Sequence, residues 1–370
     1  MPRTAVDVTA MHVDRGGSAE HVRGLAAAFG DDPHIVRIAS PGARPPSHPR
    51  RMRDRLATLQ RDLRWSLRDV ERAARAAGAE VLHVPVPIGP SWGTLPLVVT
   101  VHDLFVLSEP RRFRRWHRHY SAATIPPLVR RARRVIAVSS HTREALLDRF
   151  GLEPSRVQVV PNGVRDDFAP LTADDPRRAA LRARFGLPAR YVASLGQVEP
   201  RKNLERLAAA ARHVAQRPGC RDLVVVHAGP MGWGASVEAV PAAAAASAGA
   251  FRLVGTLSPE DLAVFVAGAE MLAYPSLGEG FGLPVAEAMA CGIAVLTSHA
   301  GALAETAGRD AEIVEPTSVE AIAASLERLW TDAAHRAHVA ACGLARAARW
   351  RWPAVAEATR QVYALAADDA

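Results

Sequence analysis

The stretch that decides the fold runs from residue 274 to residue 298 and reads YPSLGEGFGLPVAEAMACGIAVLTS. An apolar run ends at Tyr274, and a loop with alternating glycines follows it. Pro284 then stands where a helix accepts proline, in its first turn. Glycines allow backbone N–H groups to approach a ligand closely, and a helix N-terminus attracts anions. The stretch therefore predicts a strand, an anion-binding loop and a helix, which is typical of a parallel α/β sheet.

Two glutamates in this stretch are candidate ligand-binding residues. Glu279 lies in the loop, and Glu287 lies about one turn inside the expected helix, so both carboxylates can face one ligand. Carboxylates accept hydrogen bonds from sugar hydroxyls and so fix the orientation of a sugar. The alternative is a plain loop-to-helix junction in which the helix dipole favours glutamate. The repeated glycines favour ligand binding, because they are costly without a ligand.

A second informative stretch, LGQVEPRKNL at residues 195–204, also lies between an expected strand and an expected helix. It places Arg201 and Lys202 at a helix start, where two cations oppose the helix dipole. A bound diphosphate would explain them, because a departing phosphate needs its charge stabilised. Lys202 is the only lysine in the chain, which indicates a site that requires a compact ammonium group. The alternative is a solvated Arg–Lys pair.

The rest of the chain alternates between expected strands and helices, which predicts two doubly wound α/β domains. Residues 165–176, RDDFAPLTADDP, are rich in Asp and Pro and are expected to link a domain at 1–165 to one at 177–349. Strands are expected at residues 5–9, 34–39, 81–84, 97–102, 135–138, 157–160, 191–195, 223–227, 251–254, 271–274, 294–297 and 312–314. Helices are expected at residues 50–77, 118–132 and 140–150, and others are expected to begin near residues 18, 203, 258, 283, 301 and 319.

Composition limits the function classes. The 370 residues carry a net charge of +8, and residues 1–165 hold 27 Lys+Arg against 15 Asp+Glu, so the basic half should meet an anionic partner. No apolar run approaches the roughly 20 residues that span a bilayer. The start of the sequence lacks the charged-then-apolar order of a signal peptide, and the three cysteines show no metal or disulfide spacing. We therefore expect a cytoplasmic protein.

The run Arg111–Arg134 contains nine arginines and no acidic residue, with three aromatic residues interleaved. It fits a membrane-surface patch, a patch for an anionic acceptor, or a solvated face. A nucleic-acid-binding protein is a further alternative, but the chain has no recognisable recognition helix or aromatic sheet motif, so we expect no nucleic-acid partner.

The two informative stretches resemble the retaining glycosyltransferases of family 4, which have the GT-B fold. EGFGLPVAE matches the Glu-x7-Glu pattern of that family, and the resemblance extends in the same order over nearly the whole chain. The other matching segments are GG at 16–17, TVHDL at 100–104, VIAVSS at 135–140, VVPNGV at 159–164, EPRKNL at 199–204, ACGIAVLTSHAGALAE at 290–305 and AEIVEPTSVEAI at 311–322.

The resemblance implies two Rossmann-like domains that face a cleft, with residues 350–366 forming a helix that packs back on the first domain. It also implies roles for individual positions. Glu287 would hold the donor ribose, and Arg201 and Lys202 would grip the diphosphate. The transferred sugar would meet the hydroxyl-binding side chain of Glu279 and the backbone of Phe281, Gly282 and Leu283. From the first domain, Gly16 and Gly17 would approach the phosphate and the acceptor, and His102 would lie near the anomeric carbon.

The reaction implied by the resemblance is transfer of a hexose from a nucleotide-diphosphate sugar to a glycan, a glycolipid or another hydroxyl acceptor. The anomeric configuration would be retained without a metal or other cofactor, and His102, Glu279 and Lys202 would be the catalytic residues. The EPRKN segment resembles that of enzymes that use GDP-mannose, so mannose is favoured. A nucleotide-sugar epimerase, a phosphorylase and a catalytically silent scaffold remain alternatives on the same fold. Gln197, Ala294 and Gly278 depart from the common family pattern without removing a charged group.

Overall fold

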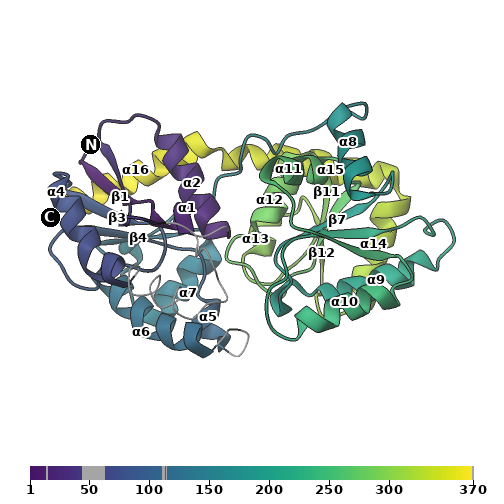
Figure 1. Cartoon of the computed structure of the whole chain (residues 1–370), viewed down its shortest axis with the longest axis horizontal. Coiled ribbons are helices and arrows are strands. Elements are labelled where there is room, and N and C mark those ends of the chain that lie inside the picture. The colour runs from purple at the N-terminus through teal and green to yellow at the C-terminus, as the bar shows by residue number, and fades with distance from the viewer. Residues whose placement is uncertain (14–15, 44–62, 111–112, 114, 369–370) are drawn as a thin grey trace. The chain divides into compact units, whose positions relative to one another are not determined.

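The computed structural model describes residues 1–13, 16–43, 63–110, 113 and 115–368. The chain divides into two compact units. The first unit comprises Met1–Gly163 with Trp352–Ala370, and the second comprises Val164–Arg351. Within the described residues each unit contains a six-stranded parallel sheet with helices packed against it (Figure 1). The predicted α/β fold is therefore confirmed.

The first sheet has the strand order β2-β1-β3-β4-β5-β6. Successive residues of its strands point to opposite faces, so Val81 and Val98 pack in one apolar cluster while Leu82 and Val99 pack in another. Its strands are β1 Thr4–Asp7, β2 Ile35–Ile38, β3 Val81–Val84, β4 Leu97–Val101, β5 Arg134–Ala137 and β6 Val157–Val159. Its helices are α1 Thr9–Val13, α2 Gly17–Phe29, α4 Val70–Ala76, α5 Phe105–Ser108, α6 Arg115–Arg131, α7 Ser140–Phe150 and α16 Trp352–Asp368.

The second sheet has the order β12-β11-β10-β7-β8-β9. Its strands are β7 Val192–Leu195, β8 Val225–Ala228, β9 Phe251–Gly255, β10 Met271–Tyr274, β11 Ala294–Ser298 and β12 Glu312–Val314. Its helices are α8 Pro176–Phe185, α9 Leu204–Ala215, α10 Ser236–Ala246, α11 Pro259–Ala267, α12 Leu283–Ala290, α13 Leu303–Ala307, α14 Val319–Thr331 and α15 Ala333–Ala347. The strand order reverses direction between β7 and β10, and ligands of such sheets bind beyond the carboxyl ends of the strands at this point.

Helix α16 completes the core of the first unit. Tyr363 of α16 is fully buried, and its hydroxyl lies 2.7 Å from Nδ1 of the buried His83 on β3. Trp352 begins α16 between Gly24 and Gly163, where an added Cβ would lie 2.0 and 2.3 Å from the indole ring. The two glycines are therefore required by the close approach of this tryptophan.

The structure contains helices that the sequence analysis did not predict. Of these, α1 and α5 span only five and four residues and α8 buries only Leu181, but the longer helices α10 and α15 were also missed. Residues 165–176, predicted to link the two domains, belong to the second unit, and Phe168 among them is buried. Part of the helix predicted at 50–77 lies outside the described residues; its remainder forms α4 and the single π-helical turn Trp65–Asp69 that precedes it.

Candidate functional site

The strongest candidate site in the second unit lies where the strand order reverses. Strands β7 and β10 pair in parallel, so the loops that leave their carboxyl ends start side by side. One loop carries Arg201 and Lys202, and the other carries Glu279. The backbone joins the two loops, because Leu277 N donates to the carbonyl of Arg201 at 2.7 Å. Residues 77 positions apart thus share one site.

The loop that leaves β7 is shaped by close backbone approaches. Gly196 has a φ of +117°, and an added Cβ there would lie 3.1 Å from Lys202 Cε. Gly229 packs on the other side, where a Cβ would lie 1.8 Å from the Gly196 carbonyl oxygen. Arg201 and Lys202 lie in a 3-10 turn, Pro200–Lys202, directly before α9 and its N-cap Asn203, so they stand at a helix start as predicted. The Lys202 side chain therefore packs closely against the backbone of Gly196.

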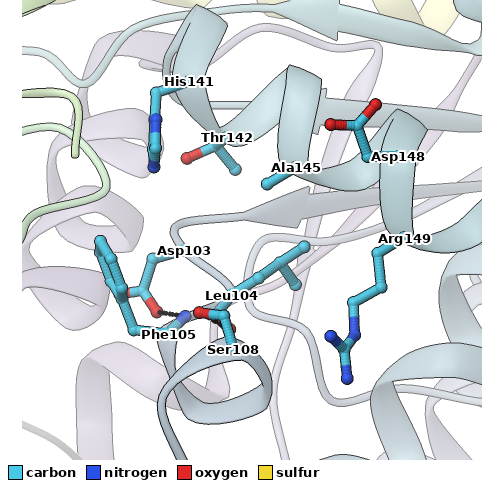
Figure 2. Close-up of a pocket in the computed structure, with 9 residues that line it drawn as sticks. All are labelled: Asp103, Leu104, Phe105, Ser108, His141, Thr142, Ala145, Asp148 and Arg149. Carbon is cyan, nitrogen blue, oxygen red and sulfur yellow. Dashed lines mark hydrogen bonds between the residues drawn. The ribbon is translucent and has the colours of Figure 1, made fainter.

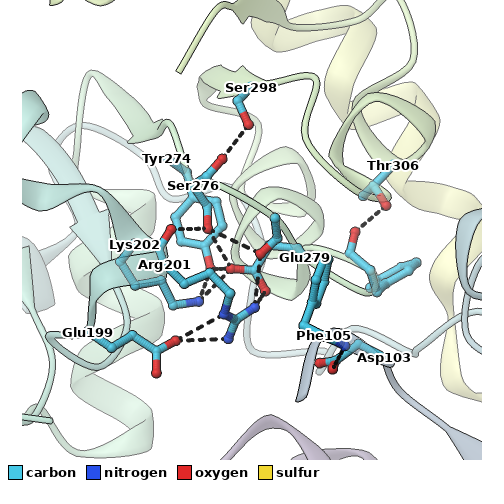
Figure 3. A network of polar contacts seen from close by, with 12 residues as sticks. Asp103, Phe105, Glu199, Arg201, Lys202, Tyr274, Ser276, Glu279, Ser298 and Thr306 are labelled. Atoms are coloured by element: carbon cyan, nitrogen blue, oxygen red, sulfur yellow. Dashed lines mark hydrogen bonds and ion pairs between the residues drawn. The ribbon is translucent and has the colours of Figure 1, made fainter. Parts of the chain in front are cut away.

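Four side chains converge on the Glu279 carboxylate (Figure 3). Lys202 Nζ lies 2.7 Å from Oε1, and an Arg201 guanidinium nitrogen lies 2.6 Å from Oε2. The hydroxyls of Tyr274 and Ser276 donate to Oε1 at 2.8 and 2.9 Å, and Lys202 also donates to the Tyr274 hydroxyl. Each carboxylate oxygen therefore faces a cation.

The network is buried and balanced in charge. The side chains of Lys202 and Glu279 are each 10 % exposed, and that of Arg201 is 20 % exposed. Arg201 also pairs with the carboxylate of Glu199 at 2.9 Å, so two cations face two carboxylates. Buried charges need such pairing because the loss of hydration is costly. A ligand that carries more negative charge than the Glu279 carboxylate would compete with it for Arg201 and Lys202.

The pKa values in the network reflect the opposing effects of burial and of the neighbouring charges. Burial alone would raise the pKa of Glu279, but the charges of Arg201 and Lys202 outweigh burial and lower it to about 2. Burial lowers the pKa of Lys202, and the charge of Glu279 opposes that effect. Burial and the Glu279 charge together raise the pKa of Tyr274. The Tyr274 hydroxyl therefore stays protonated and acts as a hydrogen-bond donor to Glu279.

Asn203 is a positioning residue that the sequence analysis missed. It adopts a left-handed conformation with a φ of 59°, which turns the chain between the 3-10 turn and α9. Its side-chain amide donates to the carbonyls of Pro275 and Pro316 at 2.9 and 2.7 Å. Asn203 thus ties the loop of Lys202 to the loop of Glu279. Its being one of only two asparagines in the chain was the available signal.

The residues whose backbone is predicted to contact the sugar, Phe281, Gly282 and Leu283, lie at the start of α12. Gly282 precedes this helix with a φ of +91°, and an added Cβ would lie 2.6 Å from a methyl carbon of Leu303. Phe281 is buried, and its carbonyl accepts from Thr306. Leu283 begins α12, and Glu287 lies buried in the second turn. The helix start and its proline are as predicted, whereas the ligand contacts of these residues remain predictions.

The other predicted residues lie in the first unit. His102 directly follows β4, and its Nε2 lies 3.0 Å from the Pro85 carbonyl. A carbonyl only accepts hydrogen bonds, so Nε2 carries the proton and Nδ1 is left as an acceptor. Burial lowers the pKa of His102 against the opposing effects of Pro85 and Asp103, which keeps the ring neutral at neutral pH. Gly16 and Gly17 form the start of α2, and a Cβ at Gly17 would meet open space.

Comparison with protein families gives two matches in succession along the chain. Residues 15–168 match the model described as Glycosyltransferase Family 4. Residues 189–332 match the model described as Glycosyl transferases group 1. Both of the informative stretches of the sequence, residues 195–204 and 274–298, lie wholly within the second match.

Curated relatives agree with the family models. The chain is 26% identical over 268 residues to the O-antigen chain mannosyltransferase B of Escherichia coli, an alignment that covers 72% of this chain and 70% of the relative. It is 34% identical over 287 residues to the D-inositol 3-phosphate glycosyltransferase of Salinispora arenicola, covering 74% of this chain. That alignment spans 64% of the Salinispora protein, so the chain covers less than two thirds of its length.

Solved structures show the same fold. The sucrose-phosphate synthase of Thermosynechococcus elongatus superposes with a TM-score of 0.77 at 22% identity, with all of both chains covered. The HepE protein of Anabaena in complex with UDP-glucose superposes with a TM-score of 0.73 at 16% identity, covering 98% of this chain and all of that one. At these identities the likeness establishes the GT-B fold.

Proposed function

We propose that the chain, which has the GT-B fold, is a glycosyltransferase of the family 4 type, and that it transfers a hexose from a nucleotide-diphosphate sugar to a hydroxyl of a glycan or glycolipid. The observation that carries the proposal is the buried network of Arg201, Lys202 and Glu279 at the carboxyl ends of β7 and β10. Two cations and a carboxylate at one point match the two ends of such a donor, its diphosphate and its sugar hydroxyls.

In the proposed reaction, Arg201 and Lys202 bind the diphosphate and stabilise the charge that develops as it leaves. Glu279 accepts hydrogen bonds from the sugar hydroxyls, and the unprotonated Nδ1 of His102 accepts another. The bond between the anomeric carbon and the diphosphate oxygen breaks while the acceptor oxygen bonds to the same face of that carbon. The acceptor proton passes to a phosphate oxygen of the leaving group. The side-chain cations supply the charge that a metal ion supplies in other transferases, so we propose that none is required.

We propose mannose as the sugar and GDP-mannose as the donor. The E. coli relative is named a mannosyltransferase, which supports this choice. The Anabaena structure contains UDP-glucose, so UDP-glucose is the competing donor. Glu287, on the helix that follows the Glu279 loop, is the residue we assign to the donor ribose.

Thermal unfolding with different nucleotide sugars tests the donor assignment. We expect GDP-mannose at about 100 times its dissociation constant to stabilise the chain by about 2.7 kcal/mol, because a ligand that binds only the folded state shifts the equilibrium by mass action. UDP-glucose, dTDP-glucose and ADP-glucose should give smaller shifts. No stabilisation by any of these compounds would contradict the proposed function. Formation of an epimer in the absence of an acceptor would support an epimerase instead.

We also propose that the first unit associates with an anionic membrane through α6. Part of the arginine-rich run, residues 111, 112 and 114, lies outside the described residues, but α6 itself presents Trp116, which is 61% exposed, beside the exposed Arg115. Cationic and aromatic side chains together suit the headgroup region of an anionic leaflet. In the part of the chain that the structure describes, no helix is both long enough and apolar enough to cross a bilayer.

Vesicle flotation tests the membrane proposal. We expect the chain to float with phosphatidylserine-containing vesicles at low salt and to remain unbound with phosphatidylcholine vesicles. Trp116→Ala should weaken the binding several-fold, because the exposed indole contributes apolar contact. Arg212→Ala, on an exposed position of the second unit, serves as the control. Equal binding to both kinds of vesicle, or none to either, would contradict the proposal.

A further inference from the structure

The first unit contains a pocket that is not part of the proposed donor site. It has a volume of about 300 Å³ and lies between α5, with the residues just before it, and α7 (Figure 2). His141, Ala145 and Asp148 line it from α7 at the spacing of one helix face. The remaining lining residues are Asp103, Leu104, Phe105, Ser108, Thr142 and Arg149. All of them belong to the first unit, so the pocket is formed by that unit alone.

One wall of the pocket is aromatic. The rings of Phe105 and His141 are 24° from parallel, with their centroids 6.3 Å apart. Leu104, which also lines the pocket, is buried and apolar. A pyranose ring has one face made largely of C–H groups, and an aromatic wall with a leucine side chain removes such a face from water favourably.

The rim of the pocket is polar and carries more carboxylates than cations. Asp103 and Asp148 line the pocket together with one arginine, Arg149, and the hydroxyl of Ser108, also in the lining, donates to the Leu104 carbonyl at 3.3 Å. Asp103 is held in place, because its Oδ1 accepts from the backbone N–H of Phe105 at 3.0 Å. Carboxylates accept hydrogen bonds from hydroxyls, but they repel phosphate. The rim therefore suits an uncharged ligand with many hydroxyls.

We propose that this pocket binds a neutral hexopyranose residue of the acceptor glycan. The inference rests on the proposed function and narrows its acceptor from any hydroxyl compound to an uncharged glycan. Asp103 is adjacent in sequence to His102, the proposed catalytic residue on the acceptor side, so the pocket lies beside that residue within the first unit. A phosphorylated polyol, such as the substrate in the name of the Salinispora relative, does not suit this rim.

Ligand-observed NMR on the full chain tests the pocket directly. The probes are the methyl α-glycosides of mannose, glucose and galactose, with D-inositol 3-phosphate as the charged competitor. We expect saturation transfer to at least one methyl glycoside and no competition by the phosphorylated compound. Asp148→Asn should raise the dissociation constant of the bound glycoside about tenfold, because a hydroxyl loses an ionised acceptor. Phe105→Ala should have a similar effect through the lost aromatic wall.

Glu144→Gln is the matched control, since it also neutralises an exposed acid of α7 but lies outside the pocket lining. It should leave glycoside binding unchanged. Absence of binding by all three glycosides, equal effects of Asp148→Asn and Glu144→Gln, or displacement by D-inositol 3-phosphate would each overturn the inference. Stabilisation by nucleotide sugars in the same samples reports separately on the proposed function. If nucleotide sugars still stabilise the chain when the pocket test fails, only the acceptor assignment is overturned.

Discussion

Lys202→Ala is expected to reduce hexose transfer at least about a thousandfold while the chain remains folded, because the leaving diphosphate loses its buried ammonium partner. Lys202→Arg should not restore activity. The lysine side chain runs beside Gly196 and its Nζ lies within 2.7 Å of Glu279, which leaves no room for the wider guanidinium group. Release of the nucleoside diphosphate, measured with and without acceptor at saturating donor, gives the rate.

The control for this prediction is Arg212→Ala, which removes an exposed cation from the neighbouring α9 and should keep full activity. Thermal unfolding shows whether each variant is folded. Turnover by Lys202→Ala within a few-fold of the unmodified chain would remove Lys202 from the reaction and, with it, the main support for the proposed function.

Glu279→Gln is expected to abolish transfer and also to destabilise the second unit at neutral pH. The pKa of Glu279 is lowered from 4.5 to about 2 on folding, a difference equivalent to about 3 kcal/mol. A group whose pKa is lowered on folding stabilises the folded state above its unfolded pKa, and this contribution is lost as the pH falls. The destabilisation should therefore be complete above about pH 5 and should vanish as the pH approaches 2.

Calorimetric melting at pH 7 and at pH 3 measures this effect. For a unit of this size, about 3 kcal/mol corresponds to a fall in Tm of roughly 6–12 °C at pH 7. The fall should be clearly smaller at pH 3. Glu238→Gln changes an exposed carboxylate of the same unit and should leave Tm unchanged at both pH values. An equal fall in Tm at the two pH values would show that the Glu279 carboxylate does not stabilise the unit through its charge.

The sequence was sufficient to predict the loop–helix junctions but not the network that they form. The two stretches that follow β7 and β10 were recognisable by their glycines and by a single lysine. That Lys202 and Glu279 bond to each other depends on the reversal of strand order between those strands, which no spacing along the chain reveals. Tyr274 and Ser276 were missed as hydrogen-bond donors to Glu279, because hydroxyl side chains at the end of a strand have no distinctive sequence pattern.

The glycoside pocket was also beyond sequence analysis. It depends on α5, which spans four residues and is too short to show a helical period. The α7 side of the pocket was predictable as a helix, since Ser139 caps its start and Gly151 ends it. Which face of α7 borders a pocket follows only from the position of α5, whose residues line the same pocket.

The first unit precedes the second in the sequence, but its apolar core includes the C-terminal helix. That core can be completed only after every residue of the second unit has been synthesised. Helix α16 supplies Tyr363, Val355 and Val362 to the apolar cluster of the first unit, yet it is translated after every residue of the second unit. On the ribosome, the first sheet therefore keeps one apolar face incompletely covered until α16 emerges, while the second unit already has all of its residues. Domains usually fold in the order of their synthesis, and this connectivity prevents the first unit from doing so.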